Sequence, residues 1–188
     1  MRAFSNSVKR FAPWAVCLIF GLTRLSAATL VQLSLADMIG QSTAIEHAKV
    51  VSSWAAFTGS IVYTHYKLQV SERLKGQSIT EIVVFGGVAN GIRQSYSGTP
   101  QLNAGDDFVL FLWTNKAGMT HIVGMTQGLF AIARDGSADP AVTRAATQEH
   151  MLDGKTGHAV KDQTLTLKLS DLRAQIASTL GGAKAGQR

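Results

Sequence analysis

Apolar and polar side chains alternate most regularly between Ile61 and Leu74. One face of this segment carries Val62, Thr64, Tyr66, Leu68 and Val70, and the other carries Tyr63, His65, Lys67, Gln69 and Ser71. A period of two is typical of a β-strand with one buried face. A strand of this length must bend, as strands of small barrels do.

Other apolar stretches bounded by turn residues predict further strands. They are Thr29–Leu33, Ala44–Trp54, Ile79–Phe85, Asp107–Thr114, Met119–Met125 and Leu129–Arg134. The stretch that starts at Asp107 is almost wholly apolar, which predicts a central strand covered on both faces. Ser34 as an N-cap, followed by Asp37, predicts a short helix that ends at Gly40.

The pattern changes after Asp135. Residues 140–151 are polar and loosely helical, so we expect a helical extension that starts at about residue 140. Ser170 is expected to cap a last helix, whose apolar stripe is Leu172, Ile176 and Leu180. Residues 181–188 are expected to form a disordered tail.

These elements predict a mainly β fold in one domain that spans residues 29–180. A small OB-like antiparallel β-barrel with a short N-terminal helix and a C-terminal docking helix is the first choice. A seven-strand β-sandwich is the second choice.

Residues 1–28 have the composition of a secretory signal peptide. Arg2, Lys9 and Arg10 precede an apolar run over 11–22, and small residues follow up to Ala27 and Ala28, where we expect cleavage. The apolar run is too short to span a membrane, which takes about 20 residues. The sequence therefore predicts a secreted or periplasmic protein with no membrane span after cleavage.

Removal of this leader changes the charge. The chain has 18 basic and 12 acidic residues, and four of the basic ones precede Thr29, so the remainder carries only +2. No basic cluster remains to neutralise phosphates, and nucleic acid is not an expected partner. The lone cysteine, Cys17, is in the leader, which excludes disulfides, thiolate metal sites and thiol catalysis from the rest of the chain.

Sequence motifs for catalysis, metal binding or cofactor binding are missing. The five histidines have no zinc-site spacing, and neighbouring side chains at Asp106 and Asp107 point to opposite faces of a strand. We therefore expect no cofactor, no metal and no enzymatic activity. A hydrolase would need His65 or His121 to meet one of these two carboxylates. The two tryptophans Trp54 and Trp113 are interpreted as packing residues of the core or its rim.

The segment from Gly86 to Gly98 is the best candidate for binding. It is long and rich in glycine, and loops on a rigid scaffold often hold binding groups. A plain connection between strands, with glycines placed for backbone reasons, is the alternative interpretation. The candidate binding residues are Asn90, Arg93, Gln94, Ser95 and Tyr96.

Several segments in this order resemble a known group of proteins. They are Ser34–Asp37, Ser42–Ala44, Ala48–Val51, Tyr63–Gly76 and Asn103–Leu112. The order is similar to secreted bacterial β-barrel proteins of unassigned function and, more remotely, to netrin-like modules, the OB-type barrel of tissue inhibitors of metalloproteases. The resemblance implies the barrel. It transfers no inhibitory residue, because those inhibitors use an N-terminal cysteine that this chain lacks.

The sequence thus predicts a secreted, non-catalytic binding domain whose partner is a secreted or envelope protein. The alternative, which rests on the resemblance, is a modulator or inhibitor of a secreted metalloprotease. A hydrolase is the second alternative. The ligand and the oligomeric state stay open.

Overall fold

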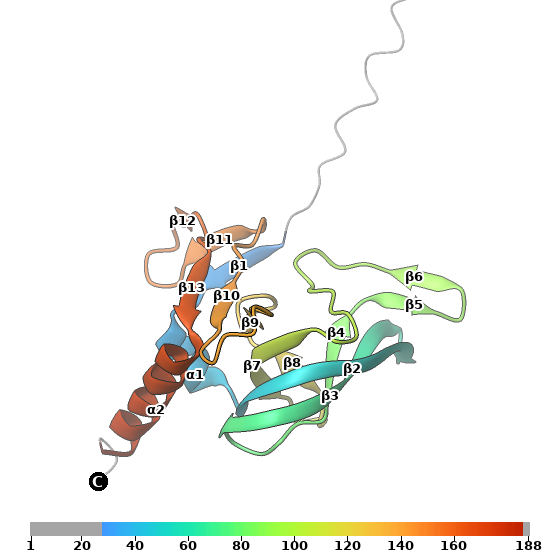
Figure 1. The fold of residues 1–188 in the computed structure, drawn as a ribbon. Helices are drawn as coiled ribbons and strands as arrows, with labels where there is room; N and C mark the ends of the chain where they lie inside the picture. Colours follow the sequence, from blue (N-terminus) through green and yellow to red (C-terminus); the bar gives the residue numbers. More distant parts are fainter. Residues whose placement is uncertain (1–27, 186–188) are drawn as a thin grey trace, which may run out of the picture.

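The computed structural model describes residues 28–185. Its largest element is an eight-stranded antiparallel sheet (Figure 1). The main path through this sheet runs β13 (Leu165–Lys168), β10 (Ala141–Arg144), β9 (Leu129–Ile132), β7 (Asp107–Thr114), β2 (Ala44–Thr58), β3 (Ile61–Lys75) and β4 (Glu81–Phe85). A short strand, β8 (Thr120–Ile122), pairs with the end of β7.

Two small sheets accompany the large one. In the first, β1 (Thr29–Gln32) runs parallel to β11 (His150–Asp153), which also pairs with β12 (Ala159–Val160). The second is a hairpin of β5 (Gly87–Ala89) and β6 (Ile92–Gln94). Figure 1 shows this hairpin projecting on the side of the molecule opposite the C-terminal helix.

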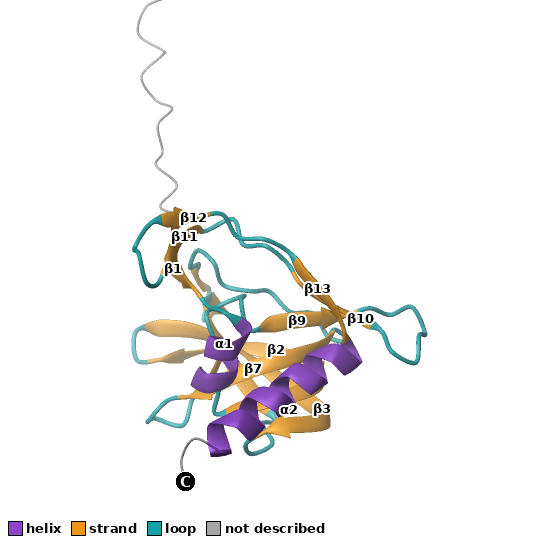
Figure 2. Ribbon diagram, turned by 90° about the vertical axis from the view of Figure 1, so that its left-hand side faces the viewer, coloured by secondary structure: helices purple, strands orange, loops and turns teal. Residues whose placement is uncertain are grey.

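Two helices cover one face of the large sheet. They are α1 (Leu35–Gln41) and α2 (Leu169–Ala185), and Figure 2 shows both in front of β2, β7 and β3. The α1 helix begins with the expected capping box, in which Ser34 and Asp37 satisfy each other's backbone N–H groups. The predicted fold class, mainly β with antiparallel sheets and two helices, is confirmed.

Strand β7 separates two hydrophobic cores. Its residues Phe108, Leu110 and Leu112 point into the core enclosed by β2, β3, β4 and β8, and Val109 and Phe111 point into the core beneath the helices. All five are buried, as expected for a strand covered on both faces.

The sheet curls around the first core, and bulges in the β2–β3 ladder bend these two long strands. The ladder ends at β4, which lies beside β8 without pairing to it, so hydrogen bonding does not close the curl into a barrel.

The structure differs from the sequence analysis in the C-terminal part. Strands β10 to β13 occupy the region where a helical extension was expected from about residue 140. Strand β10 was not predicted because one of its buried positions is occupied by a charged residue, Arg144. Arg144 is buried there because it forms an ion pair with Asp162. The α2 helix runs to Ala185, so part of the expected disordered tail from residue 181 is helical.

Residues 1–27 lie outside the described part of the chain, and with them the predicted signal peptide and most of its cleavage region. The helices that the structure describes are too short or too polar to cross a membrane.

Candidate binding surface

The predicted binding segment folds as a tight hairpin. Ala89 pairs with Ile92, so Asn90 and Gly91 alone form the turn. Both have positive φ angles, 51° and 76°, which is the pattern of a type I′ turn. Asn-Gly is the preferred sequence for this turn, and its backbone twist matches the twist of the two flanking strands.

Gln94 fastens the hairpin to the end of the large sheet. Its side-chain carbonyl accepts a hydrogen bond of 2.7 Å from the Val62 N–H, and its amide donates one of 2.9 Å to the Ser60 carbonyl. The Thr64 hydroxyl adds a hydrogen bond of 2.7 Å to the Gly86 carbonyl. Gln94 was predicted to bind a partner, but its side chain is engaged in holding the two hairpins together.

Gly87 permits this close approach. Its φ angle is 137°, and a Cβ atom there would lie 2.6 Å from the Thr64 hydroxyl and 3.0 Å from the Ala55 Cβ. Only glycine satisfies both the backbone conformation and the space. The alternative interpretation of the glycines, as residues needed by the backbone, is therefore correct at Gly87.

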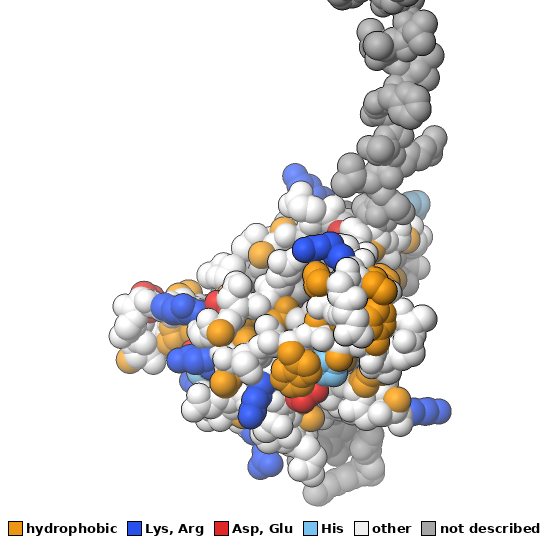
Figure 3. Space-filling model, turned by 90° about the vertical axis from the view of Figure 1, so that its right-hand side faces the viewer, with side chains coloured by type: hydrophobic (Ala, Val, Ile, Leu, Met, Phe, Trp, Pro, Cys, Tyr) orange, Lys and Arg blue, Asp and Glu red, His pale blue; other side chains and the backbone are white. Residues whose placement is uncertain are grey.

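Large apolar side chains are exposed on this hairpin and beside it. Val88 and Ile92 lie near the turn, on opposite faces of the hairpin, and are 50% and 53% exposed, and Tyr96 is exposed a few residues later. Arg93 follows Ile92 in the sequence, and its side chain is also exposed. On the face drawn in Figure 3, hydrophobic side chains gather in clusters next to Lys and Arg side chains.

A pocket of about 120 Å³ lies at the base of the hairpin. Arg93, Gln94 and Ser95 line it, opposite the end of β4 and residues 99–101. Tyr96 lies next to this pocket, with its ring 5.7 Å from that of Phe85. Asn90 is in the turn and does not line the pocket, so the structure brings together three of the five predicted residues and places a fourth at their edge.

His121 continues this surface across β8. Its ring stacks on Phe85 at 5.5 Å and lies 6.2 Å from both Tyr63 and Trp113. Burial lowers the pKa of His121, and a hydrogen bond with the Val83 backbone opposes this shift. Burial therefore favours the neutral imidazole, which packs as an aromatic ring.

The groups that a hydrolase would need are paired in other ways. Asp106, in the turn before β7, and Asp107, the first residue of β7, bond to different partners, and neither carboxylate bonds to His65 or His121. The pairs are His47 with Asp107 at 2.8 Å, His65 with Glu81 at 2.8 Å and Arg134 with Asp106 at 3.1 Å. Within residues 28–185, no three His, Cys, Asp or Glu side chains are grouped so as to hold a metal ion.

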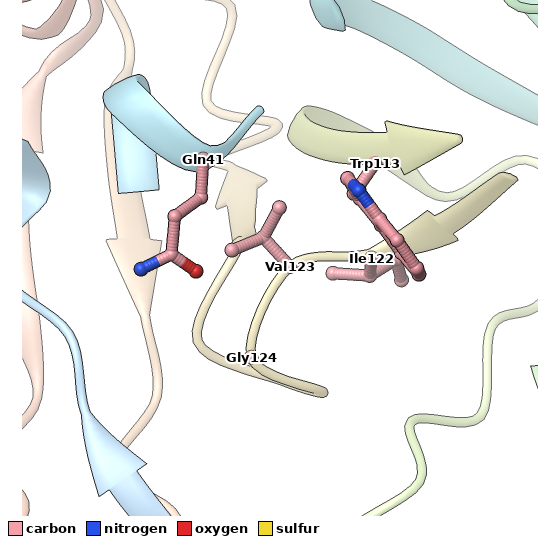
Figure 4. A pocket seen from close by; sticks show the side chains of 5 residues that line it. All are labelled: Gln41, Trp113, Ile122, Val123 and Gly124. Atoms are coloured by element: carbon pink, nitrogen blue, oxygen red, sulfur yellow. The ribbon is translucent and has the colours of Figure 1, made fainter. Parts of the chain in front are cut away.

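A larger pocket, of about 400 Å³, opens beside Trp113 (Figure 4). This pocket is also lined by Gln41, Val123 and Gly124. Ile122 forms a wall between this pocket and a small pocket next to His121. Trp113 is 47% exposed and Trp54, on β2, is 45% exposed. This exposure excludes the core for both tryptophans and leaves the rim, where Trp54 stacks on His65 at 5.1 Å.

Sequence reasoning also missed Glu46. Its side chain is completely buried in the first core, where Oε2 accepts a hydrogen bond of 3.0 Å from the Ile79 N–H and Oε1 has no partner. Burial raises the pKa of Glu46 to about 7. The signal was present in the sequence, because Glu46 shares its strand face with Ala44 and Ala48, both of which are buried.

Comparisons with known proteins do not assign a family. No protein-family model matches the chain, and no curated protein is significantly similar to it. The resemblance to netrin-like modules stays a prediction.

Proposed function

We propose that this chain is a non-catalytic, exported binding domain that docks onto another protein through its β5–β6 hairpin. The observation that supports this most is the rigid display of exposed Val88 and Ile92 at the end of that hairpin. Arg93 lies opposite Val88 on one face of the hairpin, and arginine and tyrosine, here Tyr96 at its base, are enriched at interface centres.

The rigidity of the hairpin supports a binding role over a plain connection between strands. Gln94, Thr64 and the close approach at Gly87 hold the hairpin against the β2–β3 strands. A surface that is ordered before it binds loses less conformational entropy in the complex.

Export is the part of the proposal that rests on the N-terminal segment. Its basic start, its apolar run and the small residues up to Ala28 support a leader that directs the chain out of the cytoplasm. The partner is therefore expected among secreted or envelope proteins.

An affinity comparison in the source organism tests the proposal. The full chain, tagged after Arg188, is recovered from the exported fraction as wild type, as the double variant Val88→Ser/Ile92→Ser and as Val51→Ser. Val51 is 47% exposed on β2 and is the matched control for loss of an exposed valine. Co-purified proteins are quantified by mass spectrometry.

We expect at least one exported protein to be retained by wild type and by Val51→Ser and reduced about tenfold or more by the double variant, since a loss of about 1.4 kcal/mol from the two side chains together is enough for a tenfold change. Equal capture by all three forms would refute docking through the hairpin. Recovery of the tagged chain from the cytosol alone, with its leader intact, would refute export.

A further inference from the structure

The pocket beside Trp113 has the properties of a small-molecule site. Its volume of about 400 Å³ lies within the usual range for such sites, about 300–1,000 Å³. Figure 4 shows the Trp113 ring on one side and the Gln41 side chain on the other, with Val123 between them. Val123, which is almost fully buried, forms an apolar floor, and Ile122 forms the wall shared with the small pocket next to His121.

A hydroxyl network holds the two walls in place. Gln41 ends α1 and Trp113 lies near the end of β7, and the Thr43 hydroxyl bridges the two elements by accepting a hydrogen bond of 2.9 Å from the Thr114 N–H. The Thr114 hydroxyl in turn bonds to that of Thr120 at 2.8 Å. The walls therefore keep their separation without a ligand.

The floor is fixed from below by Gln127. This buried side chain accepts a hydrogen bond of 2.9 Å from the Leu33 N–H and donates one of 2.9 Å to the Val31 carbonyl. Gly124 turns above it with a φ angle of 61°, and a Cβ there would lie 3.0 Å from the Gln127 amide nitrogen. A side chain in place of Gly124 would therefore press against Gln127, so neither residue can shift far.

The chemistry of the lining selects the ligand. None of the five lining residues is charged, so an anion or a cation would find no compensating group. The exposed indole of Trp113 offers a flat apolar surface, and the exposed Gln41 amide makes no hydrogen bond within residues 28–185. The matching ligand is uncharged, has a flat C–H-bearing face and carries several hydroxyl groups.

We propose that the pocket between Trp113 and Gln41 binds a short neutral saccharide. The C–H face of a sugar ring packs on the indole, and its hydroxyls exchange hydrogen bonds with the Gln41 amide. An apolar peptide side chain would use the indole but would make no hydrogen bond with the amide.

This site is separate from the proposed docking hairpin. None of its lining residues belongs to β5 or β6. The Val88→Ser/Ile92→Ser variant is therefore expected to bind the saccharide as wild type does, so the two proposals can fail independently.

Titrations with five neutral trisaccharides test the inference: maltotriose, cellotriose, xylotriose, mannotriose and triacetylchitotriose. The full chain is labelled with ¹⁵N, and the indole N–H signal of Trp113 is identified by its loss in Trp113→Phe. Affinities are compared among wild type, Trp113→Ala, Gln41→Ala and Trp54→Ala. Trp54 is as exposed as Trp113 but lies outside the pocket, which makes Trp54→Ala the matched control. A capped apolar tetrapeptide with leucine and phenylalanine is the competing probe.

We expect at least one trisaccharide to shift the Trp113 signal. Trp113→Ala should weaken its affinity about tenfold or more and Gln41→Ala about threefold to tenfold, whereas Trp54→Ala should leave it unchanged. No shift with any of the five sugars up to about 20 mM would overturn the proposal. A shift with the tetrapeptide alone, or an equal loss in Trp54→Ala, would overturn it as well.

Discussion

At the scale of single residues, burial of Glu46 makes the stability of the protein depend on pH. It is a carboxyl group inside an apolar core with one hydrogen bond, to the Ile79 N–H, and one oxygen without a partner. Burial disfavours the charged form, and so the pKa rises from 4.5 to about 7. The folded protein therefore holds this proton in a pH range where the unfolded chain has released it.

This difference predicts how stability depends on pH. Because the pKa of Glu46 is raised in the folded state, Glu46 lowers the free energy of unfolding least below pH 4.5, where the carboxyl group is protonated in both the folded and the unfolded chain. Stability then falls as the pH rises to about 7 and levels off above. A shift of this size corresponds to about 3 kcal/mol at most. Glu46→Gln should remove this part of the pH dependence, as measured by urea unfolding between pH 4.5 and pH 8.

Asp135→Asn is the control, because Asp135 is exposed and lies in a turn. This variant should keep the wild-type slope. If Glu46→Gln and wild type show parallel curves across the range, Glu46 is not the buried titrating group.

At the scale of elements, the β5–β6 hairpin depends on Gly87 for its position. Gly87→Ala would require a φ angle near 137° and would push a Cβ against Thr64 and Ala55. We expect a cost of about 2–3 kcal/mol in the free energy of unfolding, from backbone strain and overpacking. Hydrogen exchange of the Ala89 and Ile92 amides should also become faster.

Gly59→Ala separates the two causes. Gly59 has a φ angle of 60° in the β2–β3 turn, but nothing lies within 4 Å of an added Cβ. This variant should lose only the backbone preference, about 1–2 kcal/mol, and should leave exchange in the β5–β6 hairpin unchanged. A smaller loss in Gly87→Ala than in Gly59→Ala would contradict the close packing.

At the scale of the whole molecule, two cores share the strands β2 and β7. Ala44 and Ala48 of β2 belong to the first core, while Ile45 belongs to the second, beneath α1 and α2. A change beneath α2 is therefore transmitted to the curled part of the sheet, and both cores should unfold together.

Leu172→Ala tests this coupling. Leu172 is fully buried beneath α2, and its truncation should lower the free energy of unfolding by about 2–5 kcal/mol through lost packing and a cavity. In a Trp14→Phe background, the fluorescence of Trp54 and Trp113 reports the curled part of the sheet, and far-ultraviolet circular dichroism reports the whole molecule. Both should give the same lowered midpoint.

Gln175→Ala is the control, since Gln175 is exposed on the same helix and should leave the midpoint almost unchanged. Two separate transitions in Leu172→Ala would show instead that the helical layer unfolds by itself.

The elements that could be predicted are those whose signal is local. The alternation after Ile61, the apolar run of β7, the capping box at Ser34 and the stripe of α2 each lie within one segment, and the structure has an element at each. Strand β10 could not be found in this way, because the ion pair that allows Arg144 to be buried joins residues 18 positions apart.

The candidate site shows the same division. The sequence singled out Gly86–Gly98 from its glycines and polar residues, and Arg93, Gln94 and Ser95 do line one pocket. It did not indicate that Gln94 bonds to Ser60 and Val62 on another hairpin, and the binding role of Gln94 stays a prediction. It also missed the pocket at Trp113, since the opposite wall, Gln41, is far away in the chain.

The sequence by itself determined the mainly β class, the central buried strand and the two helices, because periodicity and caps act between neighbours in the chain. The tertiary structure alone decided how the sheet curls, which polar side chains are buried and which aromatic rings stay exposed. Those outcomes depend on the free energy of contacts between segments that meet only after folding. This free energy cannot be deduced from local patterns in the chain.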